Sequence, residues 1–310
     1  MIMEKVIIIA GPTASGKSQI ALQLAKEING EIINADSVQV YRYFDIGSAK
    51  PAESEKKSIP HHLIDIVNPD EEFNAYRFKE LAREKVQEIF KRGKIPIIVG
   101  GTGLYIRCFL FDLFTQDESL IKRERQIIDE ELKGKGLESL YNELKEVDPK
   151  SSEKIHPNDF IRITRALEFY RAYKIPLSAI HEKFNFSKSF CDYKIIVPLW
   201  EKSSLLKRII RRTEEIFQKG IADEVKKILS MGYSRDVKPF KSIGYREALE
   251  LIDGKLRQTE AIEKTINQTK KYAKRQLVWF KKEKNTCFFG ISEKNFDNII
   301  FHIKKILEIV

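Results

Sequence analysis

The sequence predicts an α/β fold in which a parallel sheet is flanked by helices and carries a helical insertion. Short β-branched runs alternate with stretches of helical spacing, the pattern of a parallel sheet covered on both faces. Residues 11–18, GPTASGKS, fit the phosphate-loop pattern G-x-x-x-x-G-K-[ST] and stand between a predicted strand and a predicted helix. Residues 117–185 are charged and helix-forming, without a strand pattern. We therefore expect a P-loop NTPase-like core of residues 1–116 and 186–310, with C-terminal helices, and a helical insertion domain at 117–185.

The individual elements follow from hydrophobic periodicity. The apolar run KVIIIA predicts a strand at 5–10, and Ile20, Leu24 and Ile28 share one helical face, which predicts a helix at 17–28. Further strands are expected at 31–34, 63–67, 95–99 and 194–199. Further helices are expected at 75–92, 203–219, 221–231, 243–252 and 259–282. The insertion should break near 134–136, 148–149 and 156–159, where glycine or proline occurs.

The bulk composition is that of a globular protein. Hydrophobic residues make up 42% of the chain, and no apolar run approaches the roughly 20 residues that cross a bilayer. The chain shows no signal-peptide pattern after Met1, so we expect a cytoplasmic protein without membrane contact. The cysteines lie far apart and the histidines lack metal-ligand spacing, so neither a disulfide framework nor a zinc site is indicated.

The net charge of +10 favours a polyanionic partner. Between residues 264 and 284 there are eight Lys or Arg against one acid, with Tyr272, Trp279 and Phe280 interleaved. For the basic run we favour nucleic acid slightly. The alternative is a solvated helix whose aromatic side chains pack inward, and for the aromatic residues alone that interpretation is preferred.

The loop at 11–18 has the chemistry of a phosphate site. Glycines let its backbone turn N–H groups inward, the following helix adds its N-terminal dipole, and Lys17 supplies a full charge. Ser18 is expected to meet a magnesium ion held together with the phosphates. The expected phosphate-binding residues are Gly11, Pro12, Thr13, Ala14, Ser15, Gly16, Lys17 and Ser18.

Asp36 follows the second predicted strand, at the edge where open α/β sheets bind their ligands. Three roles are open on position alone. It could hold magnesium, it could act as a general base that takes a proton from an attacking amine, or it could only cap its own loop.

Two further positions offer polar groups. Thr102, in GGTGLY after the strand at 95–99, presents a hydroxyl near the start of a helix, with a simple N-cap as the alternative. Arg208 and Arg212 lie four residues apart and share one helical face, where they could bind a pyrophosphate. Because Lys207 and Arg211 lie beside them, a solvated basic stripe is equally consistent with the composition.

Taken together, these stretches resemble the tRNA dimethylallyltransferases, or tRNA isopentenyltransferases, of the IPP transferase family. The matching motifs occur in order over nearly the whole chain: GPTASGKS, DSVQVY, DIGSAKP, PHHLIDI, GGTGLY, IHPNDFIRITRALE, KSIGYRE and AKRQLVWF. The resemblance implies transfer of a dimethylallyl group from dimethylallyl diphosphate to N6 of the adenosine next to the anticodon in tRNA, with release of diphosphate. Two residues depart from the family pattern. Ser48 stands where threonine is usual, and Phe217, where methionine is common, could narrow an apolar wall of the donor site.

The resemblance also implies roles for single residues. Asp36 matches the general base, Thr102 a residue that contacts the reacting adenosine, and Arg208, with Arg212 beside it, an arginine that helps the phosphate loop and Mg²⁺ to hold the diphosphate. The positions that match tRNA contacts are Asp36, Ser37, Val38, Gln39, Thr102, Arg162, Arg165, Lys241, Gly244, Tyr245 and Arg246. A further contact in the insertion falls on Arg125 or Arg123.

The implied partners are the anticodon loop of tRNA and dimethylallyl diphosphate, and we expect a monomer. Three alternatives keep the phosphate loop but change its purpose. They are an adenylate isopentenyltransferase, a small-molecule or nucleotide kinase, and a P-loop RNA-binding protein whose nucleotide only orders its structure.

Overall fold

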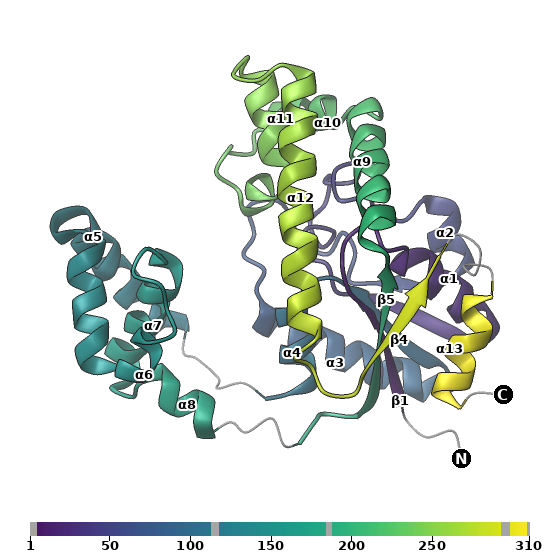
Figure 1. Cartoon of the computed structure of the whole chain (residues 1–310), viewed down its shortest axis with the longest axis horizontal. Coiled ribbons are helices and arrows are strands. Elements are labelled where there is room, and N and C mark those ends of the chain that lie inside the picture. The colour runs from purple at the N-terminus through teal and green to yellow at the C-terminus, as the bar shows by residue number, and fades with distance from the viewer. Residues whose placement is uncertain (1–4, 113–117, 184–187, 293–297, 309–310) are drawn as a thin grey trace. The chain divides into compact units, whose positions relative to one another are not determined.

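The computed structural model describes residues 5–112, 118–183, 188–292 and 298–308 (Figure 1). The chain divides into two compact units, one formed by residues 1–110 with 191–310 and the other by residues 111–190. The first unit contains the sheet, and the described part of the second contains helices. The residues predicted as a helical insertion, 117–185, fall within the second unit.

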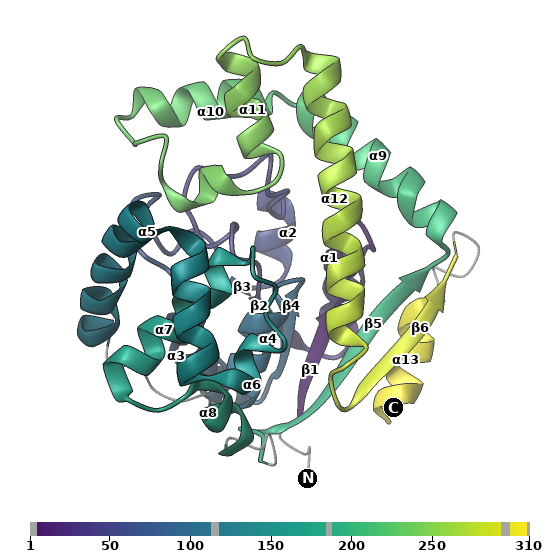
Figure 2. The same ribbon diagram turned by 60° about the vertical axis from the view of Figure 1, so that its left-hand side comes forward.

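The described strands of the first unit form one parallel sheet with the order β3-β2-β4-β1-β5-β6 (Figure 2). They are β1 (Lys5–Ala10), β2 (Gly30–Asn34), β3 (His61–His62), β4 (Ile95–Gly100), β5 (Asp192–Trp200) and β6 (Thr286–Ile291). The central strands β1, β2 and β4 are buried on both faces, which explains the β-branched runs of β1 and β4 and the Ile32–Ile33 pair of β2. The predicted α/β fold class is confirmed.

Helices cover the two faces of this sheet. On one face α1 (Lys17–Glu27) and α13 (Ile299–Leu307) pack over Ile7, Ile9 and Ile97. Ile8 and Ile98 point to the other side, because side chains alternate along a strand, and α3 (Ala75–Lys91) contacts the sheet and α4 (Gly103–Leu110) there. The remaining helices are α2 (Glu53–Ser58), α9 (Lys202–Gln218), α10 (Ile221–Ser230), the 3₁₀ helix η1 (Lys238–Lys241), α11 (Tyr245–Ile252) and α12 (Gln258–Phe280). Figure 1 shows α9 and α12 side by side.

The second unit has its own small core. Its helices are α5 (Glu118–Val147), α6 (Pro149–Ser152), α7 (Phe160–Tyr173) and α8 (Leu177–Lys183). The three predicted breaks are confirmed. α5 is kinked at Gly136, with φ 76° and ψ 171°, it ends before Asp148, and residues 156–159 lie between α6 and α7. The Asp148 carboxylate caps α6 through Ser151 N at 3.1 Å and accepts from Ser178 N at 3.0 Å, so it joins α6 to α8. The core side chains are Ile128, Leu140, Leu144, Ile163, Ala166 and Leu167.

The predicted strand at 63–67 is wrong. The strand at this edge is His61–His62 only, and Val67 forms an isolated bridge with Tyr41. Leu63 and Asp65 have φ values of 61° and 57°, in the left-handed region, which interrupts an extended chain. The elements α2, β6 and α13 were not predicted.

Glu31, near the start of β2, is a nearly buried carboxylate surrounded by basic side chains. Its side chain is 3% exposed, and its oxygens lie 2.7 Å from His62 Nε2, 2.7 Å from Arg92 Nη2 and 2.9 Å from Lys94 Nζ. Burial alone would raise the pKa of Glu31, but hydrogen bonds from these three groups hold the pKa at about 2.

Replacing this carboxylate, Glu31→Gln, is expected to lower the free energy of unfolding at neutral pH by roughly 2 to 3 kcal/mol, because the basic groups lose their buried partner. The pKa of Glu31 is lower in the folded protein than its ordinary value of 4.5, so the stabilisation is present above that pH and is lost as the pH falls toward 2. Urea unfolding of both proteins across this range measures the effect. Glu84→Gln, at an exposed position of α3, is the control. If the difference in free energy of unfolding between wild type and Glu31→Gln stayed constant on acidification, the lowered pKa of Glu31 would be contradicted.

Candidate active site

Three loops of the first unit meet because their strands are neighbours in the sheet. β2, β4 and β1 are adjacent and parallel, so their carboxyl ends lie at one edge. The phosphate loop follows β1, Asp36 follows β2, and Thr102 follows β4. Ala35 N donates to Val99 O at 2.7 Å, and Thr102 N donates to Ala35 O at 3.4 Å. Residues predicted from separate motifs are thus brought together.

The phosphate loop leads directly into α1. Gly16 has φ 86°, a backbone conformation that other residues rarely adopt, and α1 begins at Lys17. Two distant side chains brace the loop: Trp200 Nε1 donates to Ser15 O at 2.9 Å, and Arg208 Nε donates to Ala14 O at 2.8 Å. The Arg208 guanidinium also lies 4.4 Å from the centre of the Trp200 ring system. The loop conformation is therefore fixed by residues of β5 and α9.

Lys17 and Arg212 bring two positive charges into one partly buried space. Lys17 Nζ donates to Pro12 O at 2.6 Å, and burial together with the neighbouring Arg212 lowers the pKa of Lys17 to about 7, against the opposing charge of Asp36. Burial also lowers the pKa of Arg212, and no hydrogen bond to its guanidinium is found among the residues that the structure describes. An anionic ligand would stabilise both cations.

Two hollows meet at these cations. The larger, about 1180 Å³, is lined by the phosphate loop, by the segment 42–56 and by α9, including Lys50 and Arg208. The smaller, about 100 Å³, is lined by residues that include Asp36, Tyr272 and Gln276. Lys17, Ser18 and Arg212 line both. A ligand whose anionic end occupies the larger hollow can therefore extend toward Asp36 in the smaller one.

Asp36 uses one carboxylate oxygen to cap its own loop. Its Oδ1 accepts from Val38 N at 2.8 Å and Gln39 N at 3.3 Å. No hydrogen bond to Oδ2 is found within the described part of the chain. The capping role is real, and it leaves the second oxygen available to a ligand in the smaller hollow.

Thr102 is connected to both the Asp36 loop and α12. Its Oγ1 accepts from Ser37 N at 3.3 Å, and its side chain also hydrogen-bonds to Tyr272. Burial raises the pKa of the Tyr272 phenol to about 12, with a further contribution from the charge of Asp36, so this phenol is neutral at physiological pH. The Thr102 side chain therefore contacts two segments besides the helix that it precedes.

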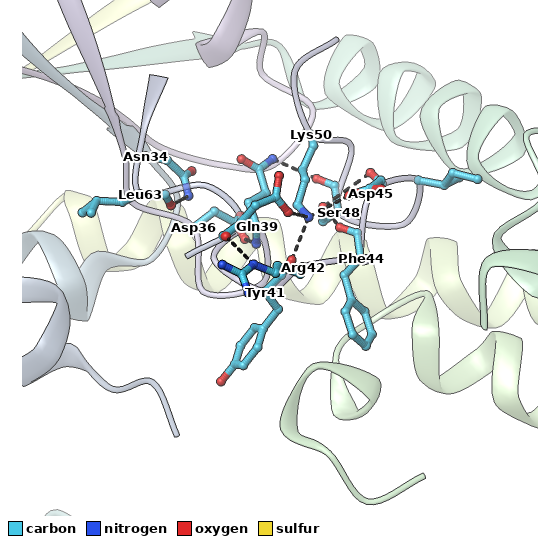
Figure 3. Close-up of polar contacts among 12 residues, drawn as sticks. Asn34, Asp36, Gln39, Tyr41, Arg42, Phe44, Asp45, Ser48, Lys50 and Leu63 are labelled. Atoms are coloured by element: carbon cyan, nitrogen blue, oxygen red, sulfur yellow. Dashed lines mark hydrogen bonds and ion pairs between the residues drawn. The ribbon is translucent and has the colours of Figure 1, made fainter. Parts of the chain in front are cut away.

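The segment that follows Asp36 is held by its own side chains (Figure 3). Lys50 Nζ donates to Tyr41 O, Asp45 Oδ1 and Asp65 Oδ1 at 2.5 to 2.7 Å. Gln39 Nε2 donates to the carbonyl oxygens of Ser48 at 3.0 Å and Ala49 at 3.2 Å. This segment therefore forms a braced wall shared by the two hollows.

Gln276 on α12 joins two of the three loops. Its Oε1 accepts from Thr13 N of the phosphate loop at 2.9 Å, and its Nε2 donates to Gly101 O at 2.9 Å. The side chain is buried. No sequence motif predicts a role for Gln276, although a glutamine between Ala273 and Phe280 on the buried face of a helix indicates an interior group with hydrogen-bond partners.

A family model described as IPP transferase matches residues 39–283. A tRNA dimethylallyltransferase of Acetivibrio thermocellus is 43% identical over 296 residues, which cover 96% of this chain and 94% of that protein. The chain belongs to the IPP transferase family. The predicted enzyme class, a prenyl transferase, is thereby confirmed.

Solved structures agree with the family. The full-length tRNA isopentenylpyrophosphate transferase of Bacillus halodurans superposes with a TM-score of 0.72 and 36% identity, covering 98% of this chain and 96% of that one. A eukaryotic dimethylallyltransferase, described as acting on tRNA, has a TM-score of 0.82 and 29% identity, with 99% and 80% covered. The P-loop NTPase-like core of this IPP transferase is therefore confirmed.

The turn that the IPP transferase motif KSIGYRE predicted as a tRNA contact has two exposed cations. Lys241 ends η1 and is exposed, and Arg246, in the first turn of α11, is 45% exposed beside Glu247. Gly244 between them has φ 91°. Tyr245 is instead buried, with the whole residue 1% exposed, which gives no support to a direct contact of Tyr245 with tRNA.

The arginines predicted to contact tRNA in the second unit lie on α5 and α7. Arg125 Nε and Arg165 Nη1 lie 3.1 and 2.9 Å from the carboxylate oxygens of the buried Glu168. The side chain of Arg125 is 44% exposed and that of Arg165 is 43% exposed. Arg162 is 70% exposed and pairs with Asp159 at 3.3 Å. All three guanidiniums are accessible to solvent.

The two departures from the family pattern have different surroundings. Ser48 Oγ donates to Phe44 O at 2.6 Å, so its hydroxyl has a structural partner. Phe217 is buried on α9 and lines neither described hollow, which gives no support to its expected effect on the donor site.

Trp279 and Phe280 pack inward, with Phe280 fully buried and Arg107 4.1 Å from the Trp279 ring centre.

No described helix combines the length and the apolar composition needed to cross a membrane.

Proposed function

We propose that this protein transfers a dimethylallyl group from dimethylallyl diphosphate to N6 of the adenosine next to the anticodon in tRNA. The observation that carries the proposal is the joining of the two hollows at Lys17, Ser18 and Arg212, with Asp36 lining the smaller one. A cationic site for a leaving diphosphate then lies next to a carboxylate that accepts a proton. The family membership supports the reaction class.

The donor diphosphate binds at the phosphate loop. Within the loop Gly11–Ser18, the residues Gly16, Lys17 and Ser18 line the larger hollow. Together with the Lys17 ammonium and the guanidiniums of Arg208 and Arg212, their backbone N–H groups surround the place where negative charge develops as the allylic carbon–oxygen bond breaks. Because Trp200 and Gln276 fix the loop, these donors need little reorganisation during the reaction.

The acceptor adenine enters the smaller hollow. Its N6 attacks the allylic carbon, the carbon–oxygen bond to diphosphate breaks, and the proton lost from N6 passes to Asp36 Oδ2. Thr102 contacts the adenine and keeps N6 beside the carboxylate. Since an adenine inside stacked RNA is out of reach, the base must leave its stack, at a cost of about a few kcal/mol that backbone contacts offset.

We propose Mg²⁺ as the cofactor. The donor set fits a magnesium ion bound largely through the diphosphate, because Ser18 offers a hydroxyl oxygen where the two hollows meet. The described residues contain no group of three His, Cys, Asp or Glu side chains that could hold a metal alone. When bound, magnesium would neutralise negative charge on the diphosphate.

The tRNA is held at several surfaces in this proposal. The segment Asp36, Ser37, Val38 and Gln39 lies beside the acceptor adenine. Lys241, Gly244 and Arg246 bind the backbone near the anticodon, and Arg125, Arg162 and Arg165 of the insertion bind further along the RNA. We expect the protein to act as a monomer in the cytoplasm.

Mass spectrometry of tRNA nucleosides before and after incubation with the protein, dimethylallyl diphosphate and Mg²⁺ tests the proposal. We expect a dimethylallyl adenosine next to the anticodon. A phosphorylated product from ATP without alkylation would favour a kinase, and alkylation of AMP in place of tRNA would favour an adenylate isopentenyltransferase. Binding of tRNA without any product would indicate an RNA-binding protein.

Donor binding should depend on pH through Lys17. Its pKa of about 7 in the protein alone means that the ammonium loses its proton as the pH rises above neutrality. An anionic donor favours the protonated form, so binding should take up a proton, and affinity should fall between about pH 7 and 9, by at most about tenfold per pH unit. Calorimetry in two buffers of different ionisation enthalpy measures the proton uptake. Lys17→Arg, which stays charged, should lose this dependence; an unchanged dependence would contradict the assignment.

A further inference from the structure

Glu224, on α10, holds the backbone of the loop that follows Phe44. Its Oε2 accepts from Asp45 N at 3.0 Å and Ile46 N at 2.7 Å, and its Oε1 accepts from Gly47 N at 3.4 Å. Oε1 also accepts from the Tyr245 hydroxyl at 2.6 Å. One carboxylate therefore serves donors from two segments that are far apart in the sequence.

The same loop is packed tightly against α10 and α11. A Cβ atom at Gly47 would lie 2.5 Å from the Tyr245 ring and 2.7 Å from Ile221 Cδ1, so only glycine fits there. The Phe44 ring meets Tyr245 edge-on with 4.9 Å between ring centres, and it meets Phe240 at 5.1 Å. The loop cannot shift without displacing these helices.

The loop that Glu224 holds also lines the candidate active site. Asp45, Ile46 and Lys50 line the larger hollow, and Ala49 and Pro51 line both hollows. Hydrogen bonds from Gln39 Nε2 to the carbonyl oxygens of Ser48 and Ala49 connect this loop to the Asp36 loop. A displacement of the loop would therefore change both the donor site and the surroundings of the base.

Glu224 is also connected to the turn 241–246. Tyr245 follows Gly244 directly, and it lies between the exposed side chains of Lys241 and Arg246. Because Tyr245 is buried and its hydroxyl donates to Glu224, the turn and the loop share one anchor.

We propose that Glu224 is a positioning residue, which holds the loop Asp45–Gly47 in place at the donor site and, through Tyr245, joins this loop to the turn 241–246. The identity of the ligands at the donor site and at the turn rests on the proposed function.

Two substitutions test the role of Glu224. Glu224→Gln keeps the size of the side chain but replaces one acceptor oxygen by an amide that only donates, and Tyr245→Phe removes the hydroxyl alone. Asp223→Asn is the matched control, since this neighbouring carboxylate is 80% exposed and pairs only with Lys226 among the described residues. For Glu224→Gln we expect kcat to fall by about 10- to 100-fold, with the Kd for tRNA within about threefold of wild type. The control should stay within about twofold in both.

Hydrogen exchange of the backbone amides of residues 45–47 supplies a readout that needs neither substrate nor activity. In Glu224→Gln these amides should exchange at least about tenfold faster, while amides of the central sheet are unchanged. Tyr245→Phe should show the same change to a smaller degree, and it carries the test if Glu224→Gln does not fold.

Wild-type exchange at residues 45–47 in both variants would overturn the proposal, as would a loss of activity that only follows the loss of folded protein. Faster exchange in a protein whose wild type transfers no dimethylallyl group would overturn the proposed function and leave the positioning role in place.

Discussion

Asp36→Asn is expected to lower the rate of dimethylallyl transfer by about 10²- to 10⁴-fold while tRNA binding stays within about threefold of wild type. Asparagine keeps an Oδ1 atom that can accept from Val38 N and Gln39 N, so the loop should keep its conformation. The amide cannot take the proton that N6 loses. The substitution therefore removes the proposed general-base role of Asp36 and keeps its role as the cap of its own loop.

Single-turnover measurement of the alkylated nucleoside gives the rate, and filter binding gives the affinity for tRNA. Asp70→Asn, at an exposed position outside the site, should behave as wild type. A rate within about tenfold of wild type in Asp36→Asn would mean that another group accepts the proton.

Lys17→Met is expected to lower kcat by about 10²- to 10³-fold and to weaken donor binding, because the leaving diphosphate loses a charge at the point where its negative charge develops. Methionine fills a similar volume without the ammonium. Lys17 lies in the first turn of α1 behind Gly16, so the backbone of the phosphate loop should be retained.

Steady-state kinetics with tRNA and with dimethylallyl diphosphate as varied substrates measure this effect. Lys26→Met makes the same change in the last turn of the same helix, at an exposed position. It should leave kcat and the KM for the donor unchanged. If Lys17→Met altered only the KM for the donor, Lys17 would contribute binding without stabilising the transition state.

Much of the site could be predicted because its parts are local motifs at strand ends. A glycine-rich turn between a strand and a helix, an aspartate after the next strand, and a GGTG turn each carry their own signal. Their convergence follows from the parallel sheet, whose carboxyl ends share one edge. The central strands β1 and β4 were predicted well because burial on both faces makes their sequences almost continuously apolar, and β2 was predicted from its Ile32–Ile33 pair.

Other features were hidden because they depend on the backbone or on distant contacts. The left-handed conformation of Leu63 and Asp65 ends β3 inside an apolar run that reads as a strand. β6 is an edge strand, half exposed at Phe288, so its pattern is weaker than that of the central strands. Gln276 and Glu224 act across 263 and 179 residues of sequence, and no local spacing predicts such partners.

The bond between Gln276 and Thr13 has a consequence for protein synthesis. The phosphate loop is made early, whereas its partner on α12 follows 263 residues later in the chain. At translation rates of about 5 to 20 residues per second, the phosphate loop waits many seconds for that partner. Until α12 has been made, the backbone N–H of Thr13 therefore lacks this acceptor, and the phosphate loop of the nascent chain lacks the support that Gln276 gives it.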